Sequence, residues 1–461
     1  MKKITYSLIA VSLLGSMLNA GTDLDSSLSQ DHTFEKKAQK EKILSVDGWE
    51  ISGDIRAGLL DYGYGNAPKQ GFVTSPPNDG QNPLINKGHG DSRGIYLIPK
   101  VSISSPKDSR IKAKVTIAGA TDFGINDSAY EGRTFVFGEK RESYLILNEG
   151  YLSYEDANHK FLVGREELTT PMIDGDDWYM LSNSFELAYY TNSSVENLTL
   201  YGGYFSKMAG IWDSGAEGTE FHSMSSASYA QYKGDVGSKG VYFAAAHYDD
   251  KEHHNAQAWE YLVDDLYNMF FAQYDYTGKI GSFEYDAGVQ FMNFKEVGYQ
   301  KSHAQAGEHI DYSLYSARFD GSFSNGINFA TGVAKYTDGE GQGQTLGAFG
   351  GYPYFANGMI FHFFEAGSLQ NAASFKAQLG YDFEKIGVKN LWIGYRYTQF
   401  SLDSDYSKST TGLGQDKMAM NGIRVSYGAS DGAYFTGTYE GVDVDHEPGI
   451  YSLRLIGGYR F

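Results

Sequence analysis

Cysteine is absent from this chain of 461 residues, so no disulfide bond can stabilise the fold. Long apolar runs are absent as well. No window reaches about eighteen consecutive apolar residues, so the sequence predicts no transmembrane helix. These absences do not exclude a membrane location, because a barrel strand exposes only alternate residues to lipid and its hydropathy averages near neutral.

The N-terminal residues have the pattern of an export signal. Lys2 and Lys3 give a positively charged start, and residues 4–14 form a short apolar stretch. We therefore predict a signal peptide at residues 1–20 and a polar periplasmic segment at residues 21–46. An exported chain without cysteine needs closed backbone hydrogen bonding or a large core for its stability.

Tyrosine, phenylalanine and glycine are abundant, with 37, 28 and 56 residues, whereas proline is scarce, with 9. Aromatic residues favour strands, and glycine marks turns and bulges. The aromatic belts of a membrane barrel would use this much tyrosine, and so would a large soluble β protein. Removal of the two signal lysines changes the formal net charge from −19 to −21. This charge argues against non-specific nucleic-acid binding and favours cations in any internal pore.

From Trp49 onward the apolar residues recur with period two, which is the pattern of β-strands. The last eleven residues alternate most regularly, and one face of that strand would carry Tyr451, Leu453, Leu455, Gly457, Tyr459 and Phe461. Tyr459 and Phe461 resemble the terminal signal that the barrel assembly machinery of the outer membrane reads. In a soluble protein, such an apolar strand face would be an aggregation hazard.

Short polar turns alternate with long loops along the chain, as a transmembrane barrel requires. Residues 105–108 and 233–238 are examples of the turns, and residues 337–372 are the longest of the loops. We predict an all-β fold, a transmembrane antiparallel β-barrel at residues 47–461 with about 18 strands. The predicted strands begin near residues 48, 94, 109, 143, 160, 184, 198, 222, 240, 266, 282, 311, 326, 373, 389, 418, 432 and 449. A barrel this wide keeps an aqueous lumen unless loops plug it.

A block within residues 164–186 carries a more specific signal. It resembles the constriction-loop region of the OprD porin family, and the matching residues are Gly164, Arg165, Leu168, Thr170, Pro171, Asn183, Phe185 and Glu186. It is most similar to the versions found as major outer membrane porins in Campylobacter and its relatives. The block departs from the family pattern at Tyr179 and Ser182, where members often have Arg and Pro.

The resemblance implies an eighteen-stranded barrel whose third external loop folds into the lumen as a constriction, assisted by the seventh. It also implies a row of basic residues along the pore wall. The acidic residues of the expected constriction loop are Glu166, Glu167, Asp174, Asp176 and Asp177. The basic residues that strand alternation directs toward the lumen are Arg56, Lys112, Lys114, Arg318, Arg396, Arg424 and Arg454. Facing rows of opposite charge would orient dipolar solutes and set ion preference.

The sequence thus predicts a porin of the bacterial outer membrane, a water-filled channel for ions and small hydrophilic solutes with a mild preference for cations. The alternative is a substrate-specific channel for amino acids or other small organic acids. The expected partners are outer-membrane lipid, the barrel assembly machinery, the solutes and, by analogy, two further copies in a homotrimer, without nucleic acid. No cofactor is expected. A divalent cation at residues 174–177 is the alternative to an ordinary acidic loop there.

Three other classes of protein fit less well. An outer-membrane enzyme would need a nucleophile held beside a histidine, and His253 and His254 lie in a polar stretch without an evident partner. We therefore predict no enzyme. A plugged transporter would need a plug domain ahead of a larger barrel, and the polar segment at residues 21–46 is too short to fold into one. The C-terminal strand argues against a secreted soluble adhesin.

Overall fold

The computed structural model describes residues 44–46, 48–63, 92–126, 136–137, 142–175, 177, 180–210, 220–228, 235–305, 309–339, 345–360, 370–405, 416–429, 432–444 and 449–461. The predicted signal peptide and nearly all of the predicted segment at residues 21–46 lie outside these ranges. Among the described residues, no helix is both long enough and apolar enough to cross a membrane.

Strands make up most of the described chain. Their bounds are β1 Leu44–Val46, β2 Trp49–Gly63, β3 Ser92–Ser104, β4 Ile111–Ala120, β5 Tyr144–Glu155, β6 His159–Glu166, β7 Ser184–Val195, β8 Leu198–Ala209, β9 His222–Ser223, β10 Val241–Asp249, β11 His254–Val263, β12 Tyr267–Ile280, β13 Phe283–Glu296, β14 Asp311–Phe323, β15 Ile327–Tyr336, β16 Ala373–Asp382, β17 Leu391–Ser401, β18 Lys417–Gly428, β19 Ala433–Val444 and β20 Ile450–Arg460. The described helical segments are short: α4 Met224–Ala227, α5 Gly298–His303 and the 3-10 turn η1 Phe383–Ile386.

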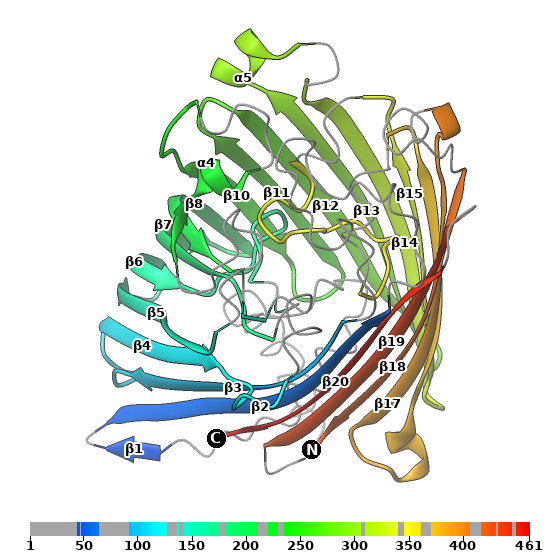
Figure 1. Cartoon of the computed structure of the whole chain (residues 1–461), viewed down its shortest axis with the longest axis horizontal. Helices are drawn as coiled ribbons and strands as arrows, with labels where there is room; N and C mark the ends of the chain where they lie inside the picture. Colours follow the sequence, from blue (N-terminus) through cyan, green and yellow to red (C-terminus); the bar gives the residue numbers. More distant parts are fainter. Residues whose placement is uncertain are drawn as a thin grey trace.

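The strands form one antiparallel sheet that closes on itself (Figure 1). Of its 20 strands, β1 and β9 have three and two residues, and the other 18 form the barrel. Each barrel strand pairs with the next, β8 pairs with β10, and β20 returns to pair with β2. At the end of this seam, Phe461 and Gly53 exchange backbone hydrogen bonds of 2.8 and 3.0 Å. Closure leaves no open sheet edge, which hydrocarbon could not satisfy.

The predicted count of 18 strands is confirmed, although one predicted position was wrong and one strand was missed. The strand expected near residue 222 is the two-residue β9, which pairs only with the end of β8. The strand β11 was missed. Residues 233–238 therefore lie within the long connection from β8 to β10 instead of forming a separate short turn. The connection β6–β7 precedes both errors and is the third loop, as predicted. The two errors cancel before the connection β15–β16, which is the seventh loop, as predicted.

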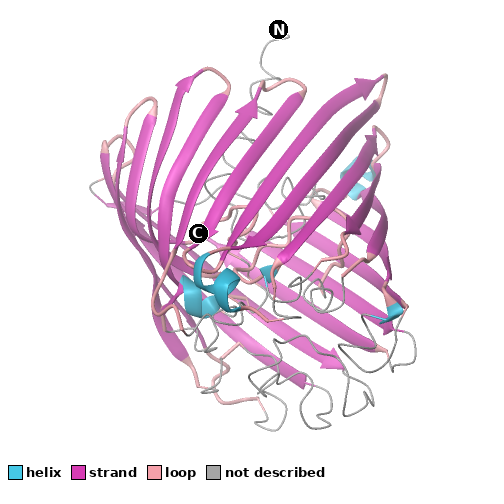
Figure 2. Ribbon diagram, turned by 90° about the horizontal axis from the view of Figure 1, so that it is seen from above, coloured by secondary structure: helices cyan, strands magenta, loops and turns pink. Residues whose placement is uncertain are grey.

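Side chains alternate between the two faces of the barrel wall. On the outer face, large apolar side chains such as Ile111, Leu145 and Val289 are exposed. Between them, charged and polar side chains such as Lys114 and Thr116 point to the inside and are half-buried or buried. Figure 2 shows the narrow turns that join the strands at one rim of the barrel. The arrangement confirms that the apolar rows face outward and the charged rows face the interior, as a membrane barrel requires.

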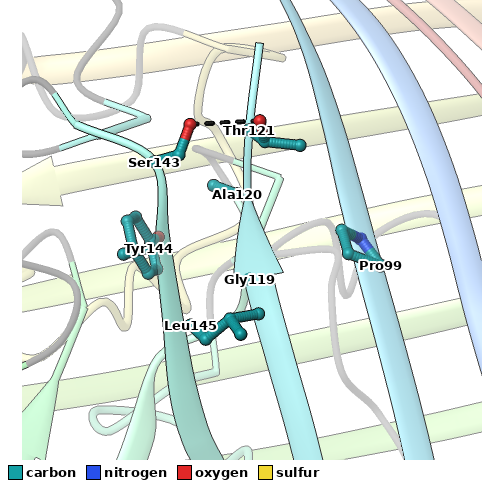
Figure 3. A pocket seen from close by; sticks show the side chains of 7 residues that line it. All are labelled: Pro99, Gly119, Ala120, Thr121, Ser143, Tyr144 and Leu145. Carbon is teal, nitrogen blue, oxygen red and sulfur yellow. Dashed lines mark hydrogen bonds between the residues drawn. The ribbon is translucent and has the colours of Figure 1, made fainter. Parts of the chain in front are cut away.

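One position on the outer face interrupts the sheet. Pro99 on β3 has no amide hydrogen to donate, and the continuous β3–β4 pairing ends beside it at Lys100, opposite Ala118. A single bridge between Leu97 and Thr121 continues the contact. The gap is a shallow apolar notch of about 370 Å³ between β3, β4 and β5, with the Ser143–Thr121 hydrogen bond at its edge (Figure 3).

The described apolar core lies inside the barrel. Segments of the third and seventh loops cross the ring in Figure 1 and pack against inward-facing strand residues. Ile173 of the third loop and Tyr352 and Tyr354 of the seventh are buried in this cluster together with the strand residues Tyr261 and Tyr336. Because the strands of a wide barrel cannot fill its interior, these loops provide the packing that the strand side chains lack.

Candidate functional site

The third and seventh loops meet inside the barrel. The third loop, residues 167–183, joins β6 to β7, and the seventh loop, residues 337–372, joins β15 to β16. Ile173 forms bridges with Phe349 and Gly350, and the amide of Asp174 donates a 3.0 Å hydrogen bond to the Phe349 carbonyl. Backbone pairing therefore joins the two loops into one partition across the lumen.

The third loop is also fixed to the barrel wall at the closing seam. Asp177 accepts a 2.7 Å hydrogen bond from the Arg56 guanidinium of β2, and its carbonyl accepts one of 3.3 Å from Arg454 of β20. Arg56 is held in place by Asp54, two residues away on the same strand face, at 2.9 Å. Tyr434 of β19 donates to the same Asp54 carboxylate. An acidic loop residue and two of the predicted wall arginines are thus brought together.

The other predicted acidic residues have different surroundings. Glu167 bonds Lys100 of β3 and accepts a 2.5 Å hydrogen bond from Asn148 of β5. Asp174 is buried inside its own loop, where Thr169 donates to it at 2.7 Å. Glu166 is the last residue of β6, buried on the inner face, with Lys160 4.0 Å away. Asp176 lies outside the described residues.

Lys112 and Lys114 point to the lumen, and both are paired with carboxylates of the neighbouring strand β5. Lys112 bonds Glu155, and Lys114 lies 2.7 Å from Glu149. A β-bulge at Asn148 turns two consecutive β5 side chains to the inner face, which is how Glu149 reaches Lys114. The basic row of β4 therefore lies beside an acidic row on the same wall, and charges of both signs line this side of the lumen.

The remaining predicted basic residues lie on strands covered by the seventh loop. Arg318 on β14 contacts three aspartates, at 2.8 Å from Asp275, 3.0 Å from Asp286 and 3.6 Å from Asp320. Arg396 on β17 donates to the Gln378 side chain and to a carbonyl of the seventh loop. Arg424 on β18 donates to Thr438 at 3.2 Å. All three guanidinium groups are buried.

Two stretches of the inner wall therefore differ. We call the inner face of β2–β6 the open wall, because its Lys112–Glu155 pair stays partly accessible, with side chains 32% and 27% exposed. We call the inner face of β13–β19 the covered wall. Most of its polar residues are buried under the seventh loop, and they include Gln290, Ser316, Arg318, Lys376, Arg396, Thr398 and Glu440. Ions and polar solutes need hydrated charged groups along their path. The Lys112–Glu155 pair offers such groups on the open wall, and on the covered wall Asp286 is 24% exposed.

Sequence reasoning missed the partners of the predicted basic residues. Glu149 and Glu155 reach the inner face only because of the bulge at Asn148, which strand periodicity does not predict. Lys100 shares the parity of the inward-facing Tyr96 and Ile98 on β3, so periodicity could have placed it on the inner face. Glu440 accepts hydrogen bonds from backbone amides of the seventh loop, and no sequence pattern predicts such a contact.

No group of three or more histidine, aspartate or glutamate side chains in the described part of the chain is arranged to hold a metal ion. The acidic run at residues 174–177 includes Asp176, which lies outside that part. His254 lies at a turn and bonds Tyr274. Residues 428–432, Gly-Ala-Ser-Asp-Gly, have the spacing of a nucleophile elbow, but they join two antiparallel strands, whereas the elbow is a strand-to-helix turn.

A family model agrees with this architecture. The model described as "outer membrane porin, OprD family" matches residues 157–401, which include both loops of the partition. The chain belongs to the OprD family of outer membrane porins. It is therefore a channel of the outer membrane for small solutes, in contact with the lipid of that membrane. A comparison with curated protein sequences gives no match.

Solved OprD-type porins have the same fold. A BenF-like porin from Pseudomonas fluorescens Pf-5 is 16% identical, with 90% of this chain and 99% of that one covered and a TM-score of 0.68. OccK8 (OprE) of Pseudomonas aeruginosa is 14% identical, with 90% and 98% covered and a TM-score of 0.67. OpdK of Pseudomonas aeruginosa, solved with vanillate, is 13% identical, with 89% and 98% covered and a TM-score of 0.65. At these identities the likeness concerns the fold of the OprD family.

Proposed function

We propose that ions and small hydrophilic solutes cross this OprD-family barrel along the open wall, with a mild preference for cations. The observation that supports the path is the contrast between the open wall and the covered wall. The Lys112 and Glu155 side chains of β4 and β5 stay partly exposed, whereas most polar residues of the covered wall are buried beneath the seventh loop. The constriction of the path is the contact of Asp177 with Arg56 and Arg454 at the barrel seam.

The distribution of charge on the open wall supports a mild preference for cations and not a strong one. Acidic and basic side chains alternate along the open wall, as in the pairs Lys114–Glu149 and Lys112–Glu155, so neither sign dominates locally. The net charge of −19 for the whole chain adds a weak negative potential. Monovalent cations are therefore favoured over anions by a small factor, and dipolar solutes find both charges within reach.

Planar-bilayer recording tests this proposal. The purified protein, reconstituted without a partner, is expected to give stepwise conductance and a reversal potential of the sign for cation preference under a KCl gradient. A channel that prefers anions would contradict the selectivity part of the proposal. A protein that inserts but passes no current would contradict the open path itself.

A second candidate is a channel with a binding preference for amino acids or other small organic acids. The alternating ammonium and carboxylate groups of the open wall favour it, because they match the two ends of a zwitterion. Swelling of liposomes that carry the protein in their membrane distinguishes a diffusion pore from a specific channel. A diffusion pore admits sugars and amino acids of equal size at similar rates, whereas a specific channel admits the amino acid several-fold faster.

The remaining expectations concern assembly and processing. We propose that the barrel assembly machinery recognises β20 through Tyr459 and Phe461, which is supported by the hydrogen bonds of Phe461 to Gly53 at the closing seam. Phe461→Ala should then slow the appearance of folded barrel in the outer membrane. The signal peptide at residues 1–20, the periplasmic segment at residues 21–46, the homotrimer and the divalent cation stay predictions. So does the particular closeness to the major porins of Campylobacter.

A further inference from the structure

The seventh loop is attached to the covered wall by its backbone and not only by apolar packing. The Pro353 carbonyl accepts a 2.7 Å hydrogen bond from Gln290, and the Phe355 amide donates one of 3.1 Å to Ser316. Thr398 donates to the Asn357 carbonyl at 2.9 Å. A backbone held at successive residues follows one path, so this part of the loop is part of the barrel wall.

Within the described residues, the last of these attachments involves one carboxylate. Glu440 on β19 accepts the amide hydrogens of Met359 and Ile360, one on each oxygen, both at 2.6 Å. Its side chain is 1% exposed. Hydrogen bonds to an ionised carboxylate are about twice as strong as those between neutral groups. Glu440 is therefore a strong tie between the loop and the wall, beside the charged Arg396 guanidinium, which donates to the Gly358 carbonyl.

Glycine makes the close approach possible. A Cβ atom at Gly358 would lie 2.5 Å from the Met420 sulfur and about 3.3 Å from a Glu440 oxygen. On the wall itself, a Cβ at Gly332 of β15 would lie 2.7 Å from the Phe355 carbonyl oxygen. Both positions leave room for backbone where any other residue would force the loop inward. The loop and the wall are thus shaped for each other.

The contact of Glu440 with the seventh loop is linked to the opposite side of the lumen through the third loop. Phe349, at the other end of the same loop segment, pairs with Ile173 of the third loop, and the third loop is fixed to Arg56 through Asp177. A continuous chain of contacts therefore runs from Glu440 on β19 through both loops to β2.

We propose that Glu440 is the positioning residue of the channel: by holding the amides of Met359 and Ile360 it keeps the seventh loop on the covered wall and so sets the aperture left along the open wall. The inference rests on the proposed path along the open wall. Loss of the carboxylate frees the loop to move, and the aperture changes although no residue of the open wall has been altered.

Three variants test the proposal by single-channel recording. Glu440→Ala removes the acceptor of both amides, so the seventh loop is no longer held in one position and the aperture varies. The single-channel conductance is therefore expected to change by about 1.5-fold or more, with larger open-channel noise. Glu440→Gln keeps one acceptor oxygen and should lie between Glu440→Ala and the wild type. Ser452→Ala is the matched control. Ser452 lies opposite Glu440 on β20 and is equally buried, and its hydroxyl makes no hydrogen bond within the described residues.

A chemical readout separates positioning from general damage. The chain has no cysteine, so Met359→Cys provides a unique thiol. A membrane-impermeant maleimide should modify it slowly when Glu440 is present and at least about tenfold faster in the Glu440→Ala background, because local release of a buried segment raises its accessible population. Folding of each variant is checked by its heat-dependent shift on a denaturing gel. If Glu440→Ala does not fold, the comparison is made in Glu440→Gln.

Equal conductance and equal labelling rates in the wild-type and Glu440-variant backgrounds would overturn the proposal. So would the same changes in Ser452→Ala, because the effect would then belong to the site in general and not to the carboxylate. A wild-type protein that conducts no ions would instead overturn the proposed path, a result that the labelling experiment does not depend on.

Discussion

Asp177→Asn removes one negative charge from the third loop where the loop meets the barrel seam. The Asp177 carboxylate lies 2.7 Å from the Arg56 guanidinium, which keeps a second partner in Asp54 at 2.9 Å. The variant therefore leaves Arg56 in place but makes the potential beside the open wall more positive. We expect the cation preference of the channel to fall.

Coulomb's law gives the size of this effect. For an ion that passes about 7 Å from the lost charge in water, the interaction changes by about 0.6 kcal/mol, with opposite signs for a cation and an anion. Screening reduces it, with Debye lengths of about 30 Å at roughly 10 mM salt and about 8 Å at roughly 150 mM. The cation-to-anion permeability ratio should therefore fall about fivefold at the lower salt concentration and about twofold at the higher one.

Reversal potentials under a salt gradient measure this ratio, and Asp61→Asn provides the matched control. Asp61 is also paired with an arginine, Arg93 at 2.7 Å, but on the outer face of the barrel near the rim. The same loss of charge there, farther from the proposed path, should change the ratio much less. If Asp177→Asn has no effect at either salt concentration, or if Asp61→Asn has an equal effect, the constriction is not at Asp177.

Three further predictions concern stability, measured by urea unfolding of the barrel refolded in phospholipid vesicles. Val289→Arg places a charge on the lipid face and should cost about 2–4 kcal/mol; a loss below about 1 kcal/mol would show that Val289 does not face hydrocarbon. The backbone amides of His254 and its two predecessors lower the pKa of Asp250 to about 2. Asp250→Ala should therefore destabilise the protein above about pH 4, and the difference should vanish as the pH falls through about 2. Arg318→Met leaves buried aspartates unpaired and should cost about 3–5 kcal/mol, whereas Lys112→Met on the open wall should cost about 1 kcal/mol or less.

The barrel was predictable because a closed membrane sheet repeats one signal many times. The alternation of apolar and polar residues on strands such as β4 and β20 indicated the fold class. The lengths of the turns and loops indicated the order in which strands and loops follow one another. The missed strand β11 shows where this signal fails. Its lipid side carries Ala256, Ala258 and Glu260, while its aromatic residues Trp259 and Tyr261 face inward. With small residues outside and aromatic residues inside, the strand lacks the apolar outer row that identifies its neighbours.

The basic residues of the site were predictable one by one, but their partners were not. Strand parity is enough to direct Lys114 inward, yet its pairing with Glu149 needs the bulge at Asn148, which shifts the register by one residue. The Arg56–Asp177 contact joins residues 121 positions apart. A contact between residues so far apart in the sequence depends on how the third loop crosses the lumen. The backbone pairing of Ile173 with the seventh loop determines that path.

If ions follow the open wall as proposed, the open and covered walls divide permeability and stability between them. Burying an ion pair costs desolvation that its attraction repays only with further hydrogen bonds. Arg318, under the seventh loop, has three aspartates and the Phe355 ring around it. Lys112, on the open wall, has one carboxylate and water access. Burial with several partners keeps the covered wall in place. The sparse pairing of the open wall leaves charges that a passing ion can contact briefly and release.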